Sequence, residues 1–377
     1  MIERRVGIVG YGVMGRAHAY AYRTAPLVRP HDTRFVPVVM SGRDAERVRD
    51  VASVFGAESE CDWRALIERP DVDVVDICTP PGTHAEIAIA AAEAGKDVVC
   101  EKPLALNSHE AEAALAAVRG AGVRHAVGFN YRRLPALSLL AELVRDGALG
   151  EVRLFRGTWL SDEFVDPATP FDWRFDRSLG GTTIADLGSH LVDLATWIIG
   201  PISAVAATSS TFVTERPAPQ GPRPVEIDDA SSALVRFASG AQGTLEMARS
   251  APRRPCDFVV EVNGSVGTAV FSYARLNELW VGSTEDDPHL YGLRRVRAEM
   301  PSHPETGGWW PVGQGVGYDA SLVNQAADLA AAWPDDSYDP DFAQGAAVVR
   351  VCEAIEHAAE QGRWVSVEPE GVAHSSG

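Results

Sequence analysis

Lys102 is the residue whose type and place most clearly suggest chemistry. It lies in Cys100-Glu101-Lys102-Pro103, directly after an apolar run that predicts a strand over 98–101. Ligands of open α/β sheets bind at the carboxyl ends of the strands. A lysine held there and partly removed from water can donate a proton to, or accept one from, a hydroxyl or carbonyl group. A surface ion pair between Glu101 and Lys102 is the alternative, but adjacent residues of a strand point to opposite faces.

Asp186 and His190 form a second polar pair, in Gly180-Gly181-Thr-Thr-Ile-Ala-Asp186-Leu-Gly-Ser-His190. They are four residues apart on a predicted helix over 183–199, so they share one face. Histidine titrates near neutral pH and suits a general base, and a carboxylate one turn away can bind a substrate or tune a lysine. A single histidine on an apolar helix is ordinarily a core residue, but two polar residues on one face favour a site. Metal ligation is another alternative, which no nearby His or Cys cluster supports, so we predict no metal.

A glycine-rich turn near the start of the chain predicts a phosphate-binding site. Gly10-Tyr-Gly12-Val-Met-Gly15 follows a predicted strand over 5–9 and precedes a predicted helix over 14–22. Gly10 allows a tight turn, Gly12 lets a pyrophosphate approach the backbone, and Gly15 lets the helix pack close to the sheet. The helix N-terminus would present free N–H groups to the phosphates. A turn without a ligand is the alternative, which the strand–turn–helix context disfavours. The candidate dinucleotide contacts here are Gly10, Gly12, Val13, Met14 and Gly15.

The residues after the second predicted strand, over 35–40, bear on the choice between NAD and NADP. NAD sites usually place an acid there, bonded to the ribose 2′-hydroxyl, whereas NADP sites tend to have small and basic residues. The sequence reads Ser41-Gly42-Arg43-Asp44, so no acid follows the strand directly. Asp44 could cap the next helix or turn inwards to the ribose. Ser41, Gly42 and Arg43 are candidate cofactor contacts, and they favour NADP modestly.

Strand-like and helix-like segments alternate up to residue 130. Strands are predicted over 5–9, 35–40, 72–79, 98–101 and 125–129, and helices over 14–22, 43–55, 83–94 and 108–119. Alternation of this kind predicts βαβ units and a parallel sheet.

After residue 130 the predicted strands come at short spacing. They cover 151–159, 204–211, 230–237, 241–247, 258–262, 268–273, 277–281 and 364–367, with helices over 136–145, 183–199, 323–333 and 343–360. Such spacing predicts a mostly antiparallel sheet. We therefore predict an α/β protein: a Rossmann dinucleotide-binding domain over 1–130, a C-terminal α+β substrate and oligomerisation domain with a large open sheet over 131–370, and a flexible tail over 371–377.

Composition excludes several classes of function. The chain has 377 residues, enough for two domains, and a net charge of −18, which argues against nucleic-acid binding and against docking on an anionic membrane. Five widely spaced cysteines without a CxxC pair make a disulfide framework or a zinc site improbable. We see no signal peptide and no apolar segment free of polar residues that could span a membrane. These features predict a cytoplasmic protein.

Together the motifs resemble those of the Gfo/Idh/MocA family, the relatives of glucose–fructose oxidoreductase and inositol dehydrogenase. The motifs that carry the resemblance are Gly10-x-Gly12-x-x-Gly15, Thr79-Pro-Pro-x-x-His84, Glu101-Lys102-Pro103, Phe129-Asn-Tyr-Arg132, Trp173-Arg174 and Gly180-Gly181-x4-Asp186-x-Gly-x-His190. The resemblance covers residues 5 to about 200 with dense motifs. Beyond that it depends on the strand pattern.

The resemblance implies a hydride transfer between a substrate carbinol carbon and C4 of nicotinamide. Lys102 would polarise and help deprotonate the hydroxyl, His190 would be the acid or base, and Asp186 would bind substrate and position Lys102. Further residues would line the cofactor (Thr79, Pro80, His84, Glu101, Lys102 and Asn130) or the substrate (Arg132, Trp173 and Arg174).

Within the family, Met14-Gly-Arg-Ala-His18 and the Gly42-Arg43-Asp44 end of strand two resemble the branch of the levoglucosan and inositol dehydrogenases. That branch uses NAD, so the choice between NAD and NADP stays open. The implied substrate is a cyclic polyol, sugar or glycoside, which Trp159, Trp173, Trp309 or Trp310 could stack against unless they are core residues. A keto-sugar reductase, an NAD-dependent glycosidase and a non-catalytic dinucleotide-binding regulator are the alternatives. An open sheet face is commonly covered by a partner subunit, so we expect a homodimer or homotetramer.

Overall fold

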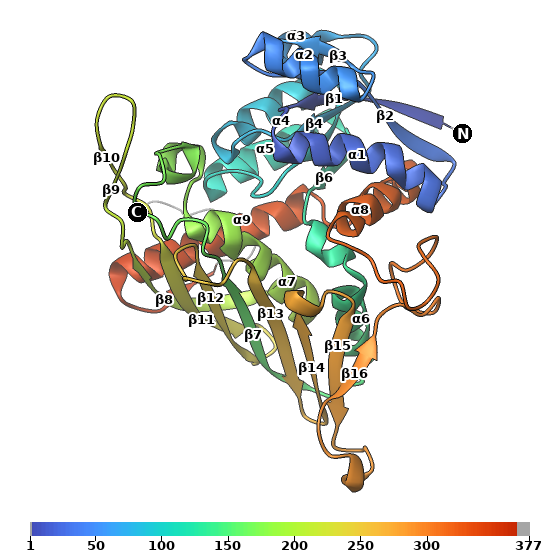
Figure 1. Cartoon of the computed structure of the whole chain (residues 1–377), viewed down its shortest axis with the longest axis vertical. Coiled ribbons are helices and arrows are strands. Elements are labelled where there is room, and N and C mark those ends of the chain that lie inside the picture. Colours follow the sequence, from blue (N-terminus) through green and yellow to red (C-terminus); the bar gives the residue numbers. More distant parts are fainter. Residues whose placement is uncertain (1, 368–377) are drawn as a thin grey trace. The chain divides into compact units, whose positions relative to one another are not determined.

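A computed structural model of the chain describes residues 2–367 and divides them into two compact units. The first unit holds residues 2–134 and 304–346, and the second holds 135–303 and 347–367. The expected tail over 371–377 lies outside the described residues. Figure 1 labels the elements.

The first unit is built on a six-stranded parallel sheet with strand order β3-β2-β1-β4-β5-β6. Its strands are β1 (Ile2–Val9), β2 (Thr33–Ser41), β3 (Glu58–Glu60), β4 (Val74–Ile77), β5 (Asp97–Cys100) and β6 (His125–Val127). This is the strand order of dinucleotide-binding folds, whose ligand lies where the order reverses, beside β1 and β4. The predicted Rossmann fold is therefore confirmed. The sequence pattern missed the short strand β3, which has only three residues and no buried apolar side chain.

Helices connect these strands. They are α1 (Val13–Val28), α2 (Ala45–Val54), α3 (Trp63–Glu68), α4 (His84–Glu93) and α5 (Ser108–Ala121). A further helix of this unit, α8 (Asp319–Ala332), follows all six strands in the chain. Asp44 and Asn107 begin α2 and α5 as N-caps, each accepting a backbone N–H from the first turn. α1 covers 13–28 instead of the predicted 14–22, about two turns longer, because it continues through Pro26.

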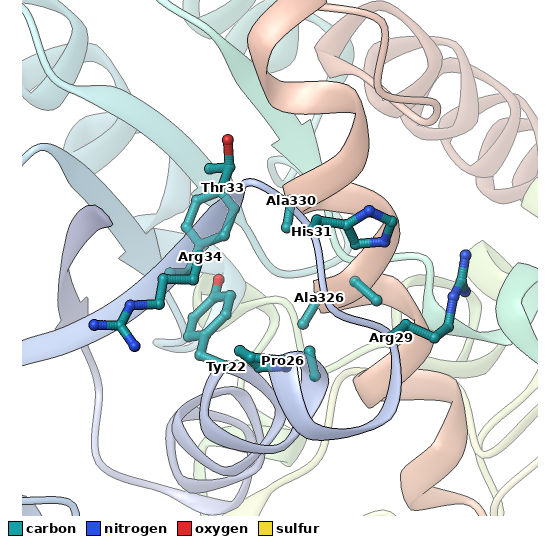
Figure 2. A pocket seen from close by; sticks show the side chains of 11 residues that line it. Tyr22, Pro26, Arg29, His31, Thr33, Arg34, Ala326 and Ala330 are labelled. Atoms are coloured by element: carbon teal, nitrogen blue, oxygen red, sulfur yellow. The ribbon is translucent and has the colours of Figure 1, made fainter. Parts of the chain in front are cut away.

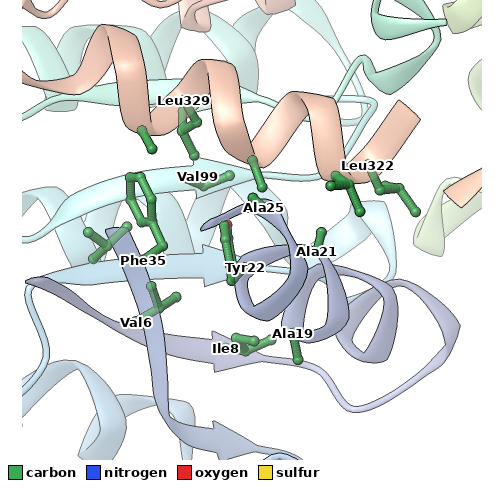
Figure 3. Packing of buried hydrophobic residues seen from close by; sticks show 14 of the residues in the cluster. Val6, Ile8, Ala19, Ala21, Tyr22, Ala25, Phe35, Val99, Leu322 and Leu329 are labelled. Carbon is green, nitrogen blue, oxygen red and sulfur yellow. The ribbon is translucent and has the colours of Figure 1, made fainter. Parts of the chain in front are cut away.

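Residues 304–346 correct the predicted domain boundary. We expected them in the C-terminal domain, but α8 packs on α1 and β2 in the first unit. Figure 3 shows Tyr22, Phe35 and Leu329 packed between α1, the sheet and α8. Small side chains of α1 and α8 let the two helices approach closely; they are Ala21, Ala25, Ala326, Ala327 and Ala330.

Ion pairs add to this packing. Arg29 at the end of α1 contacts Glu305 and Asp328 at 2.7 Å each, and Arg133 contacts Asp328 at 2.6 Å. A cavity near the end of α1, lined by Tyr22, Pro26, Arg29 and Ala330 among others, is drawn in Figure 2. Its volume is about 10 Å³, room for a single water molecule, so it is a packing gap and not a ligand site.

The second unit contains a nine-stranded sheet with order β16-β15-β14-β13-β7-β12-β11-β8-β17. The strands are β7 (Val152–Leu160), β8 (Ile202–Ser210), β11 (Ala230–Phe237), β12 (Gln242–Ala248), β13 (Asp257–Gly264), β14 (Gly267–Ser272), β15 (Glu278–Ser283), β16 (Arg294–Arg297) and β17 (Val365–Ser366). Every pairing is antiparallel except that of β12 with β7. The predicted large, mostly antiparallel sheet is confirmed.

Burial alternates along these strands, so the sheet has one covered and one open face. Helices α6 (Pro135–Arg145) and α7 (Ser189–Ile199) pack on the covered face. A small hairpin of β9 (Glu215–Arg216) and β10 (Arg223–Pro224) stands apart from the sheet (Figure 1). Helix α9 (Phe342–Gln361) leads to β17. Within residues 2–367, no helix is long and apolar enough to cross a membrane.

Candidate functional site

The three glycines of the first motif meet different surroundings. Gly10 has φ +113°, and a Cβ there would lie 2.5 Å from the carbonyl oxygen of Cys78. A Cβ on Gly15 would lie 2.0 Å from the carbonyl oxygen of Gly10. In contrast, a Cβ on Gly12 would meet no described atom within 4 Å. The fold itself therefore needs Gly10 and Gly15, whereas Gly12 leaves open space in front of the turn.

The N-terminus of α1 faces this open space. Gly12 is the N-cap residue and supplies no side chain to the first turn, which also contains no acidic residue. The first backbone N–H groups of a helix have no intrahelical acceptor, and the helix dipole favours an anion beside them. Val13 and Met14 are in that turn, so the predicted pyrophosphate contacts lie together at the carboxyl end of β1.

The end of β2 decides the role of Asp44. Its side chain accepts a hydrogen bond from the backbone N–H of Arg47 at 3.1 Å, so Asp44 is the cap of α2. Ser41 is buried, and its hydroxyl has no hydrogen-bond partner among the described residues. Gly42 is needed because a Cβ there would lie 2.1 Å from the ring of Tyr11. Arg43 is exposed. The structure therefore brings Ser41, Gly42 and Arg43 together at the carboxyl end of β2, where an adenosine ribose would lie, with Asp44 Oδ1 used as the cap of α2.

His84 holds together the loops that follow β4 and β5. Its Nε2 lies 2.8 Å from the carbonyl oxygen of Thr79 and its Nδ1 lies 2.8 Å from that of Pro103. Burial lowers the pKa of His84, although both carbonyl groups oppose the shift. The side chain is completely buried. His84 therefore links Thr79 to the Lys102–Pro103 segment, and its expected contact with the cofactor stays a prediction.

Asn130 and Arg132 lie on a short 3₁₀ turn after β6, over Asn130–Arg133. Asn130 donates to Ser321 Oγ at 2.7 Å, and Arg132 contacts Asp339 at 2.9 Å. Both side chains are buried. These contacts join the turn to the segment that contains α8. A direct role of Asn130 toward the cofactor or of Arg132 toward the substrate stays a prediction.

In the second unit, Asp186 lies on one turn of π-helix over Ile184–Gly188, directly before α7. The sequence pattern predicted a continuous α-helix through Asp186 and His190. A wider turn changes their angular relation, and such turns are frequent at functional sites. Gly188 permits this local geometry, because a Cβ there would lie 2.6 Å from Met247 Sδ on β12.

His190 is the second residue of α7, and its ring lies against the sheet. The imidazole stacks on Trp159 with ring centroids 5.3 Å apart, and Trp159 stacks in turn on Phe258 at 4.8 Å. Trp159 is therefore a core residue that supports His190, and not a platform for a sugar. Trp173 carries the guanidinium of Arg174 over its ring at 4.6 Å. In the first unit, Trp309 donates to Asn324 at 2.8 Å, whereas Trp310 is exposed.

Arg249 is a residue that the sequence analysis missed. It is fully buried and donates to the carbonyl oxygens of Arg174 and Gly181 and to the hydroxyl of Thr183, at 3.3, 2.7 and 3.0 Å. Its guanidinium also lies 3.9 Å from a carboxylate oxygen of Asp186. Alternation along β12 buries residues 243, 245 and 247, so residue 249 follows in the buried phase. An arginine at a position expected to be buried was the signal in the sequence that could have identified it.

Replacement of Arg249 by methionine is expected to lower the free energy of unfolding by about 3 kcal/mol, because buried carbonyl groups and a carboxylate lose their charged donor. Chemical denaturation measures this. The exposed Arg254 provides the matched control. Its methionine variant should change stability by less than about 0.5 kcal/mol. Equal stability of the two variants would contradict the role of Arg249 in holding the Arg174 and Thr183 segments.

Acidic groups surround Arg174. Glu163 lies 4.0 Å from it, and Asp172 lies 3.5 Å from it. Burial raises the pKa of Glu163, and the nearby Asp186 adds to the increase, while Arg174 opposes it. The second unit therefore brings Glu163, Asp186 and Arg174 into one electrostatic group. The sequence analysis named only the latter two.

The chain matches two family descriptions. Residues 4–129 match an oxidoreductase family with an NAD-binding Rossmann fold, and residues 138–270 match the GFO/IDH/MocA C-terminal domain. Levoglucosan dehydrogenase of Pseudarthrobacter phenanthrenivorans is 39% identical over 97% of this chain and 99% of its own length. Myo-inositol 2-dehydrogenase of Thermotoga maritima is 33% identical over 70% of this chain and 73% of its own.

Solved structures agree with these matches. A levoglucosan dehydrogenase in complex with NADH and L-sorbose has a TM-score of 0.94 at 39% identity, covering 98% of this chain and 100% of that chain. An oxidoreductase domain protein from Kribbella flavida has a TM-score of 0.94 at 42% identity, with the same coverage. The strand order, the glycine turn and these likenesses agree with the resemblance that the motifs carry. The chain therefore belongs to the Gfo/Idh/MocA family of NAD-binding oxidoreductases.

Proposed function

We propose that this protein is an NAD-dependent dehydrogenase acting on a CH–OH group of a sugar, cyclic polyol or glycoside. One observation carries the proposal: the open turn at Gly12 and Lys102, which follows β5, belong to the same parallel sheet. The ends of these parallel strands form the edge where such folds bind ligands. The sugar-acting relatives support the substrate class, and an anhydrosugar is the first candidate because levoglucosan dehydrogenase is 39% identical to this chain.

Bound NAD would accept the hydride at nicotinamide C4, which is chemistry that the cofactor supplies. The turn at Gly10, Gly12 and Gly15 would hold the pyrophosphate. Lys102 polarises the substrate hydroxyl and takes part in removing its proton. The family resemblance implies that His190 would act as an acid or base and that Asp186 would bind substrate. The stacked Trp159 and the guanidinium of Arg249 hold these two side chains in place.

Lysine usage supports the assignment of Lys102. The chain contains only two lysines against 32 arginines, and Lys96 is the other. Lys96 donates to the carbonyl oxygens of Arg69 and Val72, at 2.8 and 2.7 Å, so it serves the fold. An arginine stays protonated and cannot exchange a proton near neutral pH, whereas a lysine can. A proton-transferring amine in this chain therefore points to Lys102.

The test is nicotinamide reduction with a panel of anhydrosugars, inositols, aldoses and glycosides, with NAD and NADP assayed in parallel. We expect activity with NAD on at least one sugar. Measurable NADH binding without turnover of any substrate would favour the regulator. Release of an aglycone without net NADH formation would favour the glycosidase. Equal or better rates with NADP would give Ser41 and Arg43 the role of 2′-phosphate ligands.

We also propose that the open face of the nine-stranded sheet joins copies of this chain. Leu154 on β7 and Leu234 on β11 are each about half exposed on the outward phase of their strands. Light scattering after size exclusion should give a dimer or tetramer mass. A monomer at micromolar concentration would contradict this proposal.

A further inference from the structure

A buried histidine lies between two buried carboxylates in the first unit. His18 on α1 is 2% exposed, Asp76 on β4 is 0% exposed and Glu101 after β5 is 4% exposed. His18 Nδ1 lies 2.9 Å from Asp76 Oδ2, and its Nε2 lies 3.0 Å from Glu101 Oε1. Tyr22, one turn further along α1, donates its hydroxyl to Asp76 at 3.0 Å. The group thus joins α1, β4 and β5 at one point.

The surroundings of this histidine favour its charged form. Both ring nitrogens face carboxylate oxygens, which accept hydrogen bonds, and the imidazolium can donate to both at once. Burial is the largest single influence on His18 and lowers its pKa, but Asp76 and Cys78 together raise it more, and the net pKa is well above the usual value. Cys78 Sγ lies 3.6 Å from Asp76, and the ligand atoms of His18, Asp76 and Cys78 lie within 4.8 Å of one another. Their mutual hydrogen bonds satisfy the histidine without an ion.

Glu101 connects this network to Lys102. One carboxylate oxygen, Oε1, accepts from His18, while Oε2 accepts the backbone N–H of Lys102 at 3.1 Å. Gly128 makes room for the carboxylate, since a Cβ there would lie 2.8 Å from Glu101 Oε1. On the other side, the His84 ring contacts the carbonyl of Pro103. The peptide of Lys102 is therefore fixed from both directions.

We propose that His18 is a positioning residue for Lys102: through Glu101 it fixes the lysine backbone relative to α1, the helix whose N-terminus receives the cofactor phosphates. The role of Lys102 in this inference is that of the proposed function. Glu101, which the family resemblance placed against the dinucleotide, serves here as the link between His18 and Lys102.

A contribution to the stability of the fold does not by itself explain why this buried ionic network is present. Removing several charges from water is costly, and apolar side chains of similar volume are often equally or more stabilising than a buried ionic group. Hydrogen bonds from His18 to two carboxylates are directional, so they fix the orientation of these side chains, which apolar packing does not. A displacement of about 1 Å at a reacting group can lower the rate about 100-fold.

Two conservative variants of His18 distinguish the effect of its hydrogen bond to Asp76 from that of its hydrogen bond to Glu101. An asparagine amide nitrogen falls near the position of Nδ1 and can still donate to Asp76. A glutamine amide nitrogen falls near Nε2 and can still donate to Glu101. If the bond to Glu101 positions Lys102, His18→Gln should retain the position of Lys102 better than His18→Asn. If the histidine only satisfies Asp76, neither variant should change the position of Lys102.

Because the sequence contains only two lysines, the surroundings of Lys102 can be followed by NMR without measuring activity. Reductive methylation with ¹³C-formaldehyde labels Lys96, Lys102 and the N-terminal amine, so three dimethylamine signals are expected by NMR. Lys102→Arg identifies the signal of interest. We expect His18→Asn to shift or broaden the Lys102 signal, His18→Gln to leave it closer to that of the unsubstituted protein, and Lys96 to stay unchanged in both.

Gly128→Ala is the third variant, and it displaces the Glu101 carboxylate while removing no hydrogen-bonding group. It keeps the inference testable if both His18 variants fail to fold, and it too should shift the Lys102 signal. His125→Gln is the matched control. His125 is a partly buried histidine at the amino end of β6, where it pairs with Val98 at the other end of β5 from Lys102, and its substitution should leave the signal in place.

Kinetics complete the test. On a substrate found active, His18→Asn and Gly128→Ala should lower kcat about 10- to 100-fold, with the Kd of NADH changed less than about threefold. Unchanged Lys102 signals in folded His18→Asn and Gly128→Ala variants would overturn the positioning role. If the unsubstituted enzyme turns over no substrate, the proposed function fails while the NMR comparison still decides this inference.

Discussion

Lys102→Ala is expected to lower kcat by a factor of about 10² to 10⁴, the usual contribution of one positioned acid or base. The Kd of NADH should change only a few-fold, because the phosphates bind at the glycine turn of α1. Steady-state rates with NAD and fluorescence titration with NADH measure the two quantities separately. A loss confined to kcat places the lysine in the chemical step and not in cofactor binding.

The second lysine provides an internal control. Lys96→Met removes hydrogen bonds to Arg69 and Val72 and should cost stability on the order of 1 kcal/mol, with kcat unchanged. Lys102→Arg keeps a positive charge but cannot exchange a proton near neutral pH. If Lys102→Arg retained most of the activity, the charge alone would suffice, and proton transfer would have to be assigned to another group such as His190.

The sequence predicted the elements that depend on local patterns. Alternation of strands and helices up to residue 130 indicated a parallel sheet, and the Gly10, Gly12 and Gly15 spacing indicated the turn at its switch point. Asp44 was recognised as a possible helix cap from its place before α2. Each of these features is decided by residues within one supersecondary unit, which is why a single sequence suffices for them.

Features that depend on distant contacts were missed. The return of residues 304–346 to the first unit depends on α8 packing against α1, and nothing local in either helix specifies that partner. The π-helical turn at Asp186 depends on how Gly188 meets Met247 from β12. Arg249 acquires its role only because the sheet brings it beside Thr183 and Gly181. In each case, the deciding neighbour lies tens of residues away or more.

The hydrogen-bond network around His18 also depends on residues that are distant in the sequence. The sequence analysis quoted His18 as part of a family motif and Glu101 as a cofactor contact, with no link between them. They are 83 residues apart, and parallel strand order brings them to 3.0 Å. The motif therefore identified His18, whereas only the folded structure shows which carboxylates it contacts.

Gly12→Ala is expected to weaken NADH binding about 100-fold, which corresponds to about 2.7 kcal/mol. The added methyl group meets no described atom of the protein itself within 4 Å. It would enter the space that a pyrophosphate needs for close approach to the backbone. Stability without ligand should fall by less than about 1 kcal/mol, since alanine is a poorer N-cap residue than glycine. Isothermal titration gives the Kd, and thermal unfolding gives the stability.

Gly15→Ala is the matched comparison, and its effect should be of the opposite kind. Its Cβ would lie 2.0 Å from the backbone carbonyl oxygen of Gly10, so the fold must shift, at a cost of about 1–3 kcal/mol in the absence of any ligand. Added NADH should stabilise the unsubstituted protein by about 2.7 kcal/mol at 100 times its Kd. That stabilisation should be almost absent in Gly12→Ala at the same NADH concentration. Unchanged NADH binding by Gly12→Ala would mean that the cofactor does not cross this turn, and the proposed dehydrogenase function would lose its main support.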